Sequence, residues 1–140
     1  MSQNVNFGMV GLGKMGANIV RRLSRHGITS AVYDLSVDAV KSVVAEGAIA
    51  TSDMADMAAK LTAPRTIWIM VPAGVTDSTI AAMAEHLEKG DTIIDGGNSY
   101  YKNDLKNAAL LAEKGINFVD VGTSGGVYGL ERGYSLMIGG

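Results

Sequence analysis

Cysteine is absent from this chain of 140 residues. Without it there is no disulfide framework, no thiol nucleophile and no cysteine-based metal site. The two histidines, His26 and His86, lie far apart in the sequence, and no metal is expected. His26 falls at the end of a predicted helix, where the helix dipole favours a basic side chain, so it is not a candidate catalyst.

Long apolar runs and clusters of basic residues are also missing. No apolar stretch approaches the length of a membrane span, and the N-terminus has no signal-peptide pattern. The net charge is −2 and no Lys/Arg cluster occurs, which argues against nucleic acid or an anionic membrane as the main partner. Together with the missing cysteines, these absences predict a cytoplasmic protein.

Apolar residues make up 47% of the chain, enough for one domain over residues 1–140 with a substantial core. Strand and helix patterns alternate, and the helices tend to end at glycine, which is typical of βαβ units. The predicted fold is therefore α/β, a Rossmann-like, doubly wound, mainly parallel sheet. Helices are predicted over residues 14–26, 36–46 and 75–87, with two more ending at 61 and 114. Strands are predicted over residues 30–33, 66–71, 92–95, 118–121 and 136–138, with a further short strand around Ile49.

The apolar run that begins at Val5 ends in the glycine motif G-x-G-x-x-G, formed by Gly11, Gly13 and Gly16, and continues at helical spacing. Such a strand, turn and helix place a dinucleotide at the turn. Gly11 permits the tight turn, Gly13 lets the backbone approach a pyrophosphate, and Gly16 allows close packing of helix on strand. The unpaired N–H groups of the helix then face the phosphates.

Asp34 follows the second predicted strand, about 20 residues after the glycines, where an acidic residue accepts the ribose hydroxyls of a bound dinucleotide. The alternative is that Asp34 caps the next helix, with Ser36 as a competing cap. The order of strand, glycines, helix, strand and acid favours the ribose role.

Two later turns follow predicted strands and lie at the edge where ligands bind to parallel sheets. Pro72-Ala73-Gly74 follows the fourth strand and is well placed to line the cofactor site, although, taken alone, a plain turn before a helix capped by Thr76 is the better explanation. After the fifth strand, Gly96 and Gly97 let the backbone come close to another group, and Asn98 offers donor and acceptor atoms. Asn98 could instead cap the following helix.

Five glycines occur in the 12 residues from Gly122 to Gly133. Ordering so many glycines costs conformational entropy, so an anion or polyol site built from backbone N–H groups and the Ser124 hydroxyl is favoured over a flexible linker.

With these motifs assembled, the chain resembles the N-terminal domain of 6-phosphogluconate dehydrogenase (decarboxylating), within the β-hydroxyacid dehydrogenase superfamily. The resemblance rests on G-L-G-K-M-G-A-N, V-P-A-G, D-G-G-N-S and G-T-S-G-G-V-Y-G-L-E-R-G, and the last of these is similar to the shorter, NAD-linked branch. It implies 6-phosphogluconate as the substrate and a homo-oligomeric full-length enzyme with a further helical domain.

The resemblance also implies site residues. The cofactor-binding residues would be Gly11, Leu12, Gly13, Lys14, Met15, Gly16, Asp34, Val71, Pro72, Ala73 and Asn98. The substrate-binding residues would be Asn98, Ser124, Gly125 and Gly126. NADP-linked members typically have Asn-Arg-Ser where this chain has Asp34, Leu35 and Ser36, so NAD is favoured over NADP.

The family's catalytic residues, a lysine base and a glutamate acid, are expected beyond residue 140, and no motif places Lys102, Lys106 or Glu131 in those roles. The chain is thus expected to be an inactive part of the enzyme. Two alternatives remain: a dehydrogenase of the 3-hydroxyisobutyrate type, and an NAD-sensing module without chemistry.

Overall fold

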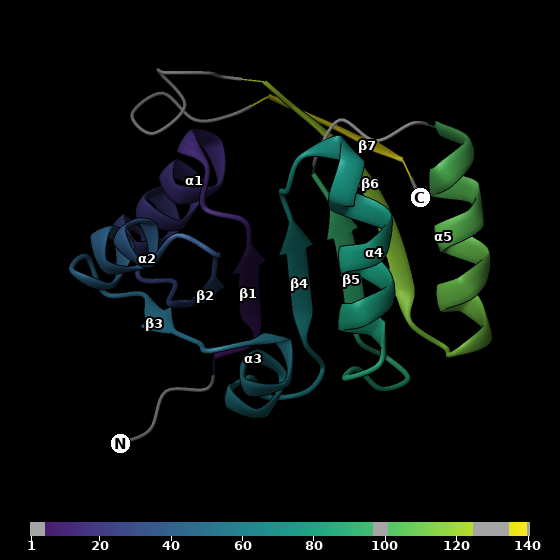
Figure 1. The fold of residues 1–140 in the computed structure, drawn as a ribbon, viewed down its shortest axis with the longest axis horizontal. Coiled ribbons are helices and arrows are strands. Elements are labelled where there is room, and N and C mark those ends of the chain that lie inside the picture. Colours follow the sequence, from purple (N-terminus) through teal and green to yellow (C-terminus); the bar gives the residue numbers. More distant parts are fainter. Residues whose placement is uncertain (1–4, 97–100, 125–134, 140) are drawn as a thin grey trace.

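The computed structural model describes residues 5–96, 101–124 and 135–139, and within these ranges strands and helices alternate (Figure 1). The strands are β1 Phe7–Val10, β2 Ser30–Tyr33, β3 Ile49–Ala50, β4 Thr66–Ile69, β5 Thr92–Asp95, β6 Asn117–Ser124 and β7 Ser135–Gly139. The helices are α1 Lys14–Arg25, α2 Val37–Val44, α3 Met54–Lys60, α4 Ala73–Ala84 and α5 Tyr101–Glu113. Among the described residues no helix is long and apolar enough to cross a bilayer.

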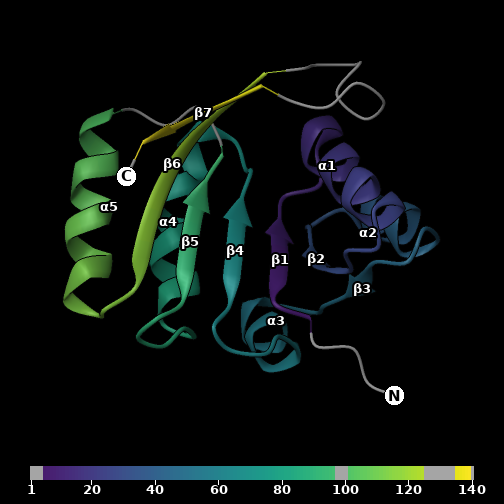
Figure 2. The ribbon, with the colours of Figure 1, turned by 180° about the vertical axis from the view of Figure 1, so that it is seen from behind.

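The strands form one sheet in the order β3-β2-β1-β4-β5-β6-β7. Neighbouring strands from β3 through β6 pair in parallel, and β7 alone runs antiparallel, against β6. Helices α1 and α2 lie on one face, and α3, α4 and α5 lie on the other (Figures 1 and 2). The predicted Rossmann-like, doubly wound, mainly parallel fold is confirmed.

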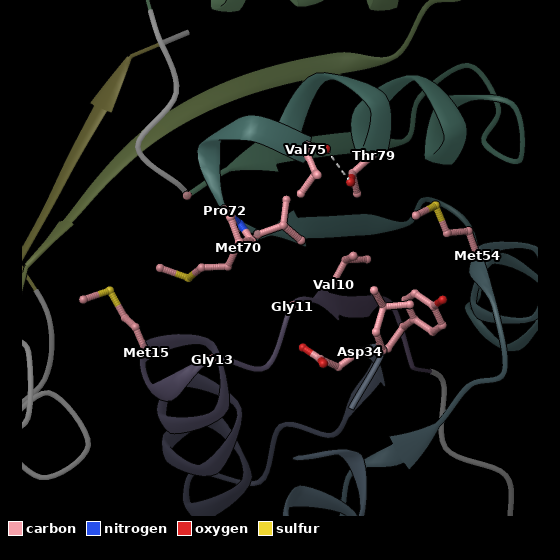
Figure 3. Close-up of a pocket in the computed structure, with 14 residues that line it drawn as sticks. Val10, Gly11, Gly13, Met15, Asp34, Met54, Met70, Pro72, Val75 and Thr79 are labelled. Atoms are coloured by element: carbon pink, nitrogen blue, oxygen red, sulfur yellow. Dashed lines mark hydrogen bonds between the residues drawn. The ribbon is translucent and has the colours of Figure 1, made fainter. Parts of the chain in front are cut away.

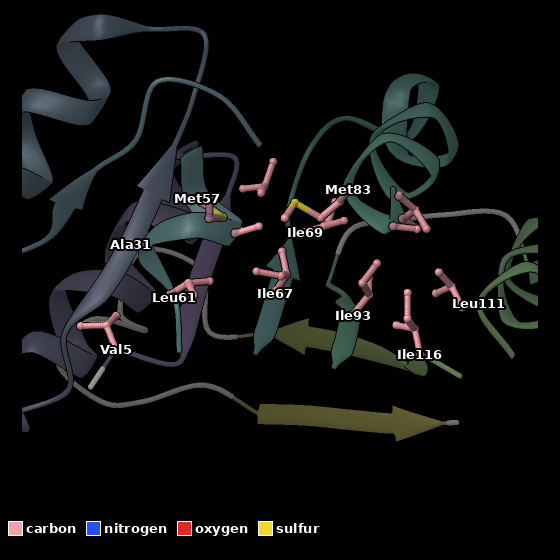
Figure 4. Packing of buried hydrophobic residues seen from close by; sticks show 14 residues of the cluster. Val5, Ala31, Met57, Leu61, Ile67, Ile69, Met83, Ile93, Leu111 and Ile116 are labelled. Carbon is pink, nitrogen blue, oxygen red and sulfur yellow. The ribbon is translucent and has the colours of Figure 1, made fainter. Parts of the chain in front are cut away.

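The core lies in two layers because alternate strand residues face opposite sides of the sheet. On β4, Ile67 and Ile69 join the larger cluster under α3, α4 and α5, which Figure 4 shows from close by. Trp68 instead contacts the smaller cluster under α1 and α2. Both isoleucines are fully buried, as expected of a parallel strand covered on both faces.

Helix boundaries follow local chemistry. Ser36 caps α2, since its side-chain oxygen accepts a hydrogen bond from the Ala39 amide, and Asp53 caps α3 in the same way. Gly27 follows α1 with φ of +81°, which is the predicted left-handed end of that helix.

Helix α4 begins earlier than predicted, and Thr76 does not cap it. The N-cap position belongs to Pro72, and the Thr76 hydroxyl is buried in the first turn, where it donates to the Pro72 carbonyl at 3.2 Å. The fixed φ of proline suits a helix start, so the chain turns into α4 directly after it.

Strand β6 is longer than predicted and includes Gly122, Thr123 and Ser124, which the sequence assigned to a glycine-rich loop. Its last residues pair with β7, with Ser124 opposite Ser135. Antiparallel pairing with β7 gives the backbone groups of these residues hydrogen-bond partners. Because these partners are distant in the sequence, no local pattern predicts the pairing.

The sheet order places a switch point between β1 and β4. From β1 the chain moves outward to β2 and β3, and it then crosses back to β4 on the other side of β1. In open parallel sheets, ligands bind beyond the carboxyl ends of the strands at such a point. The glycine motif and the Val71-Pro72 turn both follow these two strands.

Candidate functional site

The turn after β1 requires glycine at its first motif position. Gly11 has φ of +99°, and a side chain there would collide with the carbonyl oxygen of Met70 at the end of β4. The Gly11 amide donates to the Tyr33 carbonyl at 2.9 Å, which ties the turn to the end of β2. Gly11 therefore allows the tight turn and lets β1 and β4 come together at the switch point.

The other two motif glycines differ from Gly11 and from each other. A Cβ atom added to Gly13 would meet no atom within 4 Å, and Gly13 has φ of −60°, so its surroundings are open rather than strained. A Cβ atom on Gly16 would strike the carbonyl oxygen of Gly11, so this glycine lets α1 pack against the turn. Gly11 and Gly16 thus meet the steric needs predicted for them, while the approach of a pyrophosphate to Gly13 stays a prediction.

The N-terminus of α1 lies directly after Gly13, which is the N-cap residue of this helix. No side chain caps this end, and its first turn contains no acidic residue. The first amides of a helix have no partner within the helix and carry a partial positive charge, which favours an anion.

Asp34 is half-buried and bonds to two backbone amides. One carboxylate oxygen, Oδ2, accepts from the Leu12 amide at 2.6 Å, and the other, Oδ1, accepts from the Ser36 amide at 2.8 Å. Because Ser36 caps α2, Asp34 does not fill the capping role that the sequence left open. In Figure 3 its carboxylate points toward the glycine turn.

A cavity of about 760 Å³ lies over the carboxyl ends of β1, β2 and β4. The glycine turn, Asp34, Val71 and Pro72 border it, and Val75 and Thr79 of α4 face it from above in Figure 3. Its volume is within the range of cofactor pockets, which are mostly apolar with a few placed polar groups. The open approach at Gly13 and the carboxylate of Asp34 suit the pyrophosphate and a ribose of a dinucleotide.

Several predicted site residues lie elsewhere or outside the described part. Leu12 packs its side chain into the core under α1, and Lys14 is exposed at the start of that helix. Ala73 begins α4, whereas Met15 borders the cavity. Asn98, Gly125 and Gly126 fall outside the described residues, and of Ser124 only the backbone, in β6, is described.

Gly96 has a structural reason to be glycine. A Cβ atom there would collide with the indole nitrogen of Trp68 on the neighbouring strand β4. That N–H is buried and has no hydrogen-bond acceptor among the described residues. The close approach predicted for Gly96 is therefore made to Trp68, although Gly96 also borders the cavity.

Sequence reasoning missed part of the cavity wall, namely Tyr33, Met54, Val75 and Thr79. The sequence did contain a signal for Val75. It is an apolar residue directly after the turn that follows the fourth predicted strand, and no core role was predicted for it. Val75 is 48% exposed, and Leu35, at the end of β2, is 89% exposed. Exposed large apolar residues at the carboxyl edge of a parallel sheet suit an aromatic base better than water.

An open, mainly parallel sheet with a G-x-G-x-x-G turn at its switch point and an acid after β2 defines a dinucleotide-binding domain. The sequence profile of one family, the NAD binding domain of 6-phosphogluconate dehydrogenase, matches residues 6–140. The chain belongs to this family.

Relatives in both sequence and structure agree with that assignment. The chain is 40% identical over 146 residues to 6-phosphogluconate dehydrogenase, decarboxylating, of Haemophilus influenzae, and the match covers 100% of this chain and 30% of the relative. It is 37% identical over 137 residues to the NAD(+)-dependent enzyme of Haloferax volcanii, covering 97% of this chain and 45% of the relative.

A solved structure of Plasmodium falciparum 6-phosphogluconate dehydrogenase, described with NADP+ and with 6-phosphogluconate, superimposes with a TM-score of 0.88 at 31% identity. The superposition covers 96% of this chain and 30% of the other. The chain thus spans less than half the length of the relatives it matches.

Proposed function

We propose that the cavity at the switch point binds NAD. The observation that carries this proposal is that the glycine turn, the uncapped start of α1 and the Asp34 carboxylate border one cavity. Gly13 and the first turn of α1 would hold the pyrophosphate, and Asp34 would accept the hydroxyls of the adenosine ribose. Val71, Pro72 and Ala73 would flank the other half of the cofactor.

A preference for NAD over NADP is part of the proposal. A 2′-phosphate would meet the negative charge of Asp34, and the next residue, Leu35, supplies no cation to pair with it. The NAD(+)-dependent relative supports this preference, while another relative is NADP(+)-dependent.

For the full-length enzyme we propose oxidative decarboxylation of 6-phosphogluconate to ribulose 5-phosphate, with NAD accepting the hydride. The family and the names of the relatives support this activity. Residues 1–140 would supply the dinucleotide-binding domain, with Asn98, Ser124, Gly125 and Gly126 toward the substrate. A cytoplasmic location and a homo-oligomeric full-length enzyme remain predictions of the same proposal.

A second candidate is a dehydrogenase for another 3-hydroxy acid. A structure of 3-hydroxyisobutyrate dehydrogenase from Salmonella typhimurium superimposes with a TM-score of 0.84 at 25% identity, covering 96% of this chain and 47% of the other. Turnover of 6-phosphogluconate and of 3-hydroxyisobutyrate by the full-length protein distinguishes the two candidates.

Calorimetric titration of the purified chain with NAD and with NADP tests the cofactor proposal. We expect one NAD site per chain and weaker binding of NADP. No binding of either dinucleotide would refute the assignment of the cavity, and tighter binding of NADP would refute the preference.

A further inference from the structure

Two consecutive amides of the glycine turn bond to the end of β2. The Gly11 amide donates to the carbonyl of Tyr33 at 2.9 Å, and the Leu12 amide donates to the side chain of Asp34 at 2.6 Å. The first acceptor is a backbone carbonyl, so it remains whatever side chain residue 33 or 34 carries. The second exists only because residue 34 has a carboxylate.

The Leu12 amide depends on that acceptor because of where it lies. Leu12 is 5% exposed, and its side chain packs with Met9 and Ile19 in the core under α1. A buried amide without an acceptor is costly, so loss of the carboxylate would leave the turn to rearrange or admit water. The peptide group that would move joins Gly11 to Leu12, directly before Gly13.

We infer that Asp34 is a positioning residue for the phosphate-binding turn, in addition to the ribose contact assigned to it under the proposed function, on which this inference rests. Its carboxylate holds the backbone of the turn in the conformation that receives a pyrophosphate. Replacing Asp34 therefore weakens ligands that bear a diphosphate even when they have no ribose hydroxyl to offer.

Both roles fit one carboxylate at once. Two carboxylate oxygens provide about four acceptor positions. The Leu12 and Ser36 amides use one position on each oxygen, which leaves acceptor capacity for hydroxyls at the cavity side. A bound ribose would thus add to the existing hydrogen bonds and would not displace them.

A pair of nucleotide probes separates the two roles. ADP carries a diphosphate and both ribose hydroxyls, whereas 2′,3′-dideoxy-ADP keeps the diphosphate, the sugar ring and the base but lacks both hydroxyls. In the parent chain we expect ADP to bind about tenfold tighter than its dideoxy analogue, because hydrogen bonds to a charged acceptor are lost with the hydroxyls. In Asp34→Ala we expect ADP and dideoxy-ADP to bind with equal affinity. That affinity should be at least about threefold weaker than the affinity of dideoxy-ADP for the parent chain.

Amide hydrogen exchange measures the turn without any ligand. We expect the Leu12 amide to exchange at least about tenfold faster in Asp34→Ala than in the parent, while the Gly11 amide stays protected by the Tyr33 carbonyl. Ser36→Ala is the matched control. It removes the cap of α2 but keeps the Ser36 amide and the bond between Asp34 and Leu12, so Leu12 exchange and dideoxy-ADP affinity should stay at the parent values.

The outcomes are distinct. Equal affinity of dideoxy-ADP for the parent and for Asp34→Ala, or unchanged exchange at Leu12, overturns the inference and leaves NAD binding intact. A parent chain that binds neither NAD nor ADP refutes the proposed function and this inference with it. The positioning role is established if Asp34→Ala, but not Ser36→Ala, binds dideoxy-ADP more weakly and exchanges the Leu12 amide faster. The exchange of the Gly11 amide should stay unchanged in both variants.

Discussion

The glycines of the turn differ in what an added side chain would contact. Because of this difference, substitutions at some positions should affect folding and at others only ligand binding. Gly11 has a left-handed φ and lies against the Met70 carbonyl, so a substitution there disturbs the sheet itself. Gly13 has an extended backbone with open space around its Cα, so a substitution there affects only what enters that space.

Gly13→Val should therefore fold like the parent and lose NAD binding by at least about 100-fold, because the isopropyl group fills the approach to the pyrophosphate. Calorimetry gives the affinity, and circular dichroism with thermal unfolding checks the fold. Gly11→Val is the control that should unfold at a clearly lower temperature. Parent-like NAD affinity in a folded Gly13→Val chain would contradict the assignment of the glycine turn.

The proposed preference for NAD over NADP depends on the residues at the end of β2. Leu35 is 89% exposed and borders the cavity, so Leu35→Arg leaves the core unchanged. The guanidinium can pair with a 2′-phosphate, and we expect NADP to bind about tenfold tighter while NAD changes by less than about twofold. Leu35→Gln is the uncharged control, for which no gain in NADP affinity is expected. An equal gain for both dinucleotides would mean that residue 35 does not lie near the 2′ position.

At the scale of helices and strands, local chemistry made much of the fold predictable. Helices that end near Gly27 and Gly47 were predicted from glycine, and both residues have positive φ. The buried strands β2 and β5 were predicted with the observed ends. The boundary of β6 was predicted wrongly because a strand that is distant in the sequence determines it. Residues 122–124 extend β6 because β7 pairs with them, and no nearby residue indicates this.

The same reason explains which site residues were found. The glycines and Asp34 belong to one βαβ unit, whose spacing is visible in the sequence. Met54 and Thr79 border the cavity only because two separate connections, α3 between β3 and β4 and α4 between β4 and β5, lie on the face beside it. Sequence spacing contains no information on that contact.

At the opposite, amino edge of the sheet, one ion pair joins the segments that lead into β4 and β5. Asp91 is 1% exposed, and its carboxylate accepts from the amides of Arg65 and Glu88 and from the Arg65 guanidinium, at 2.7 to 2.9 Å. Burial raises the pKa of Asp91, but these hydrogen bonds and the Arg65 charge more than offset it, so the pKa lies below its ordinary value of 3.8.

Asp91→Asn should lower the free energy of unfolding at pH 7 by about 2–4 kcal/mol, because the half-buried guanidinium of Arg65 loses the charge of its buried partner. Denaturant unfolding measures the change. Glu85→Gln, at an exposed position, is the control and should stay within about 0.5 kcal/mol of the parent. NAD affinity of the folded Asp91→Asn chain should match the parent, since the pair lies at the edge away from the cavity.

The stability of the parent should also depend on pH through Asp91. The carboxyl binds a proton less readily in the folded chain than in the unfolded one, so its contribution is fully present above about pH 4 and is lost as pH falls through the lowered pKa. Unfolding followed below pH 4 should show a weaker pH dependence for Asp91→Asn than for the parent. Identical slopes would show that Asp91 does not contribute in this range.

At the scale of the whole molecule, the described lining of the cavity consists mostly of apolar side chains and backbone groups. Among the described residues that border it, the titratable ones are Tyr33 and Asp34, and both lie at the end of β2 where the ribose is assigned. Lys106 is on α5, outside the cavity lining. The groups that the described lining does provide are those that the proposed function assigns to a bound dinucleotide.

The purified 140-residue chain should accordingly bind NAD and fail to oxidise 6-phosphogluconate. A general base must come within hydrogen-bond reach of the reacting hydroxyl, and base and acid each contribute about 10²–10⁴-fold to rate, so a chain without both should give no NADH above background. Absorbance at the NADH band, with NAD and 6-phosphogluconate in excess, measures this. Substrate-dependent NADH production that disappears in Ser124→Ala would contradict the prediction, and Lys102, Lys106 and Lys114 would then be the first candidates for the base.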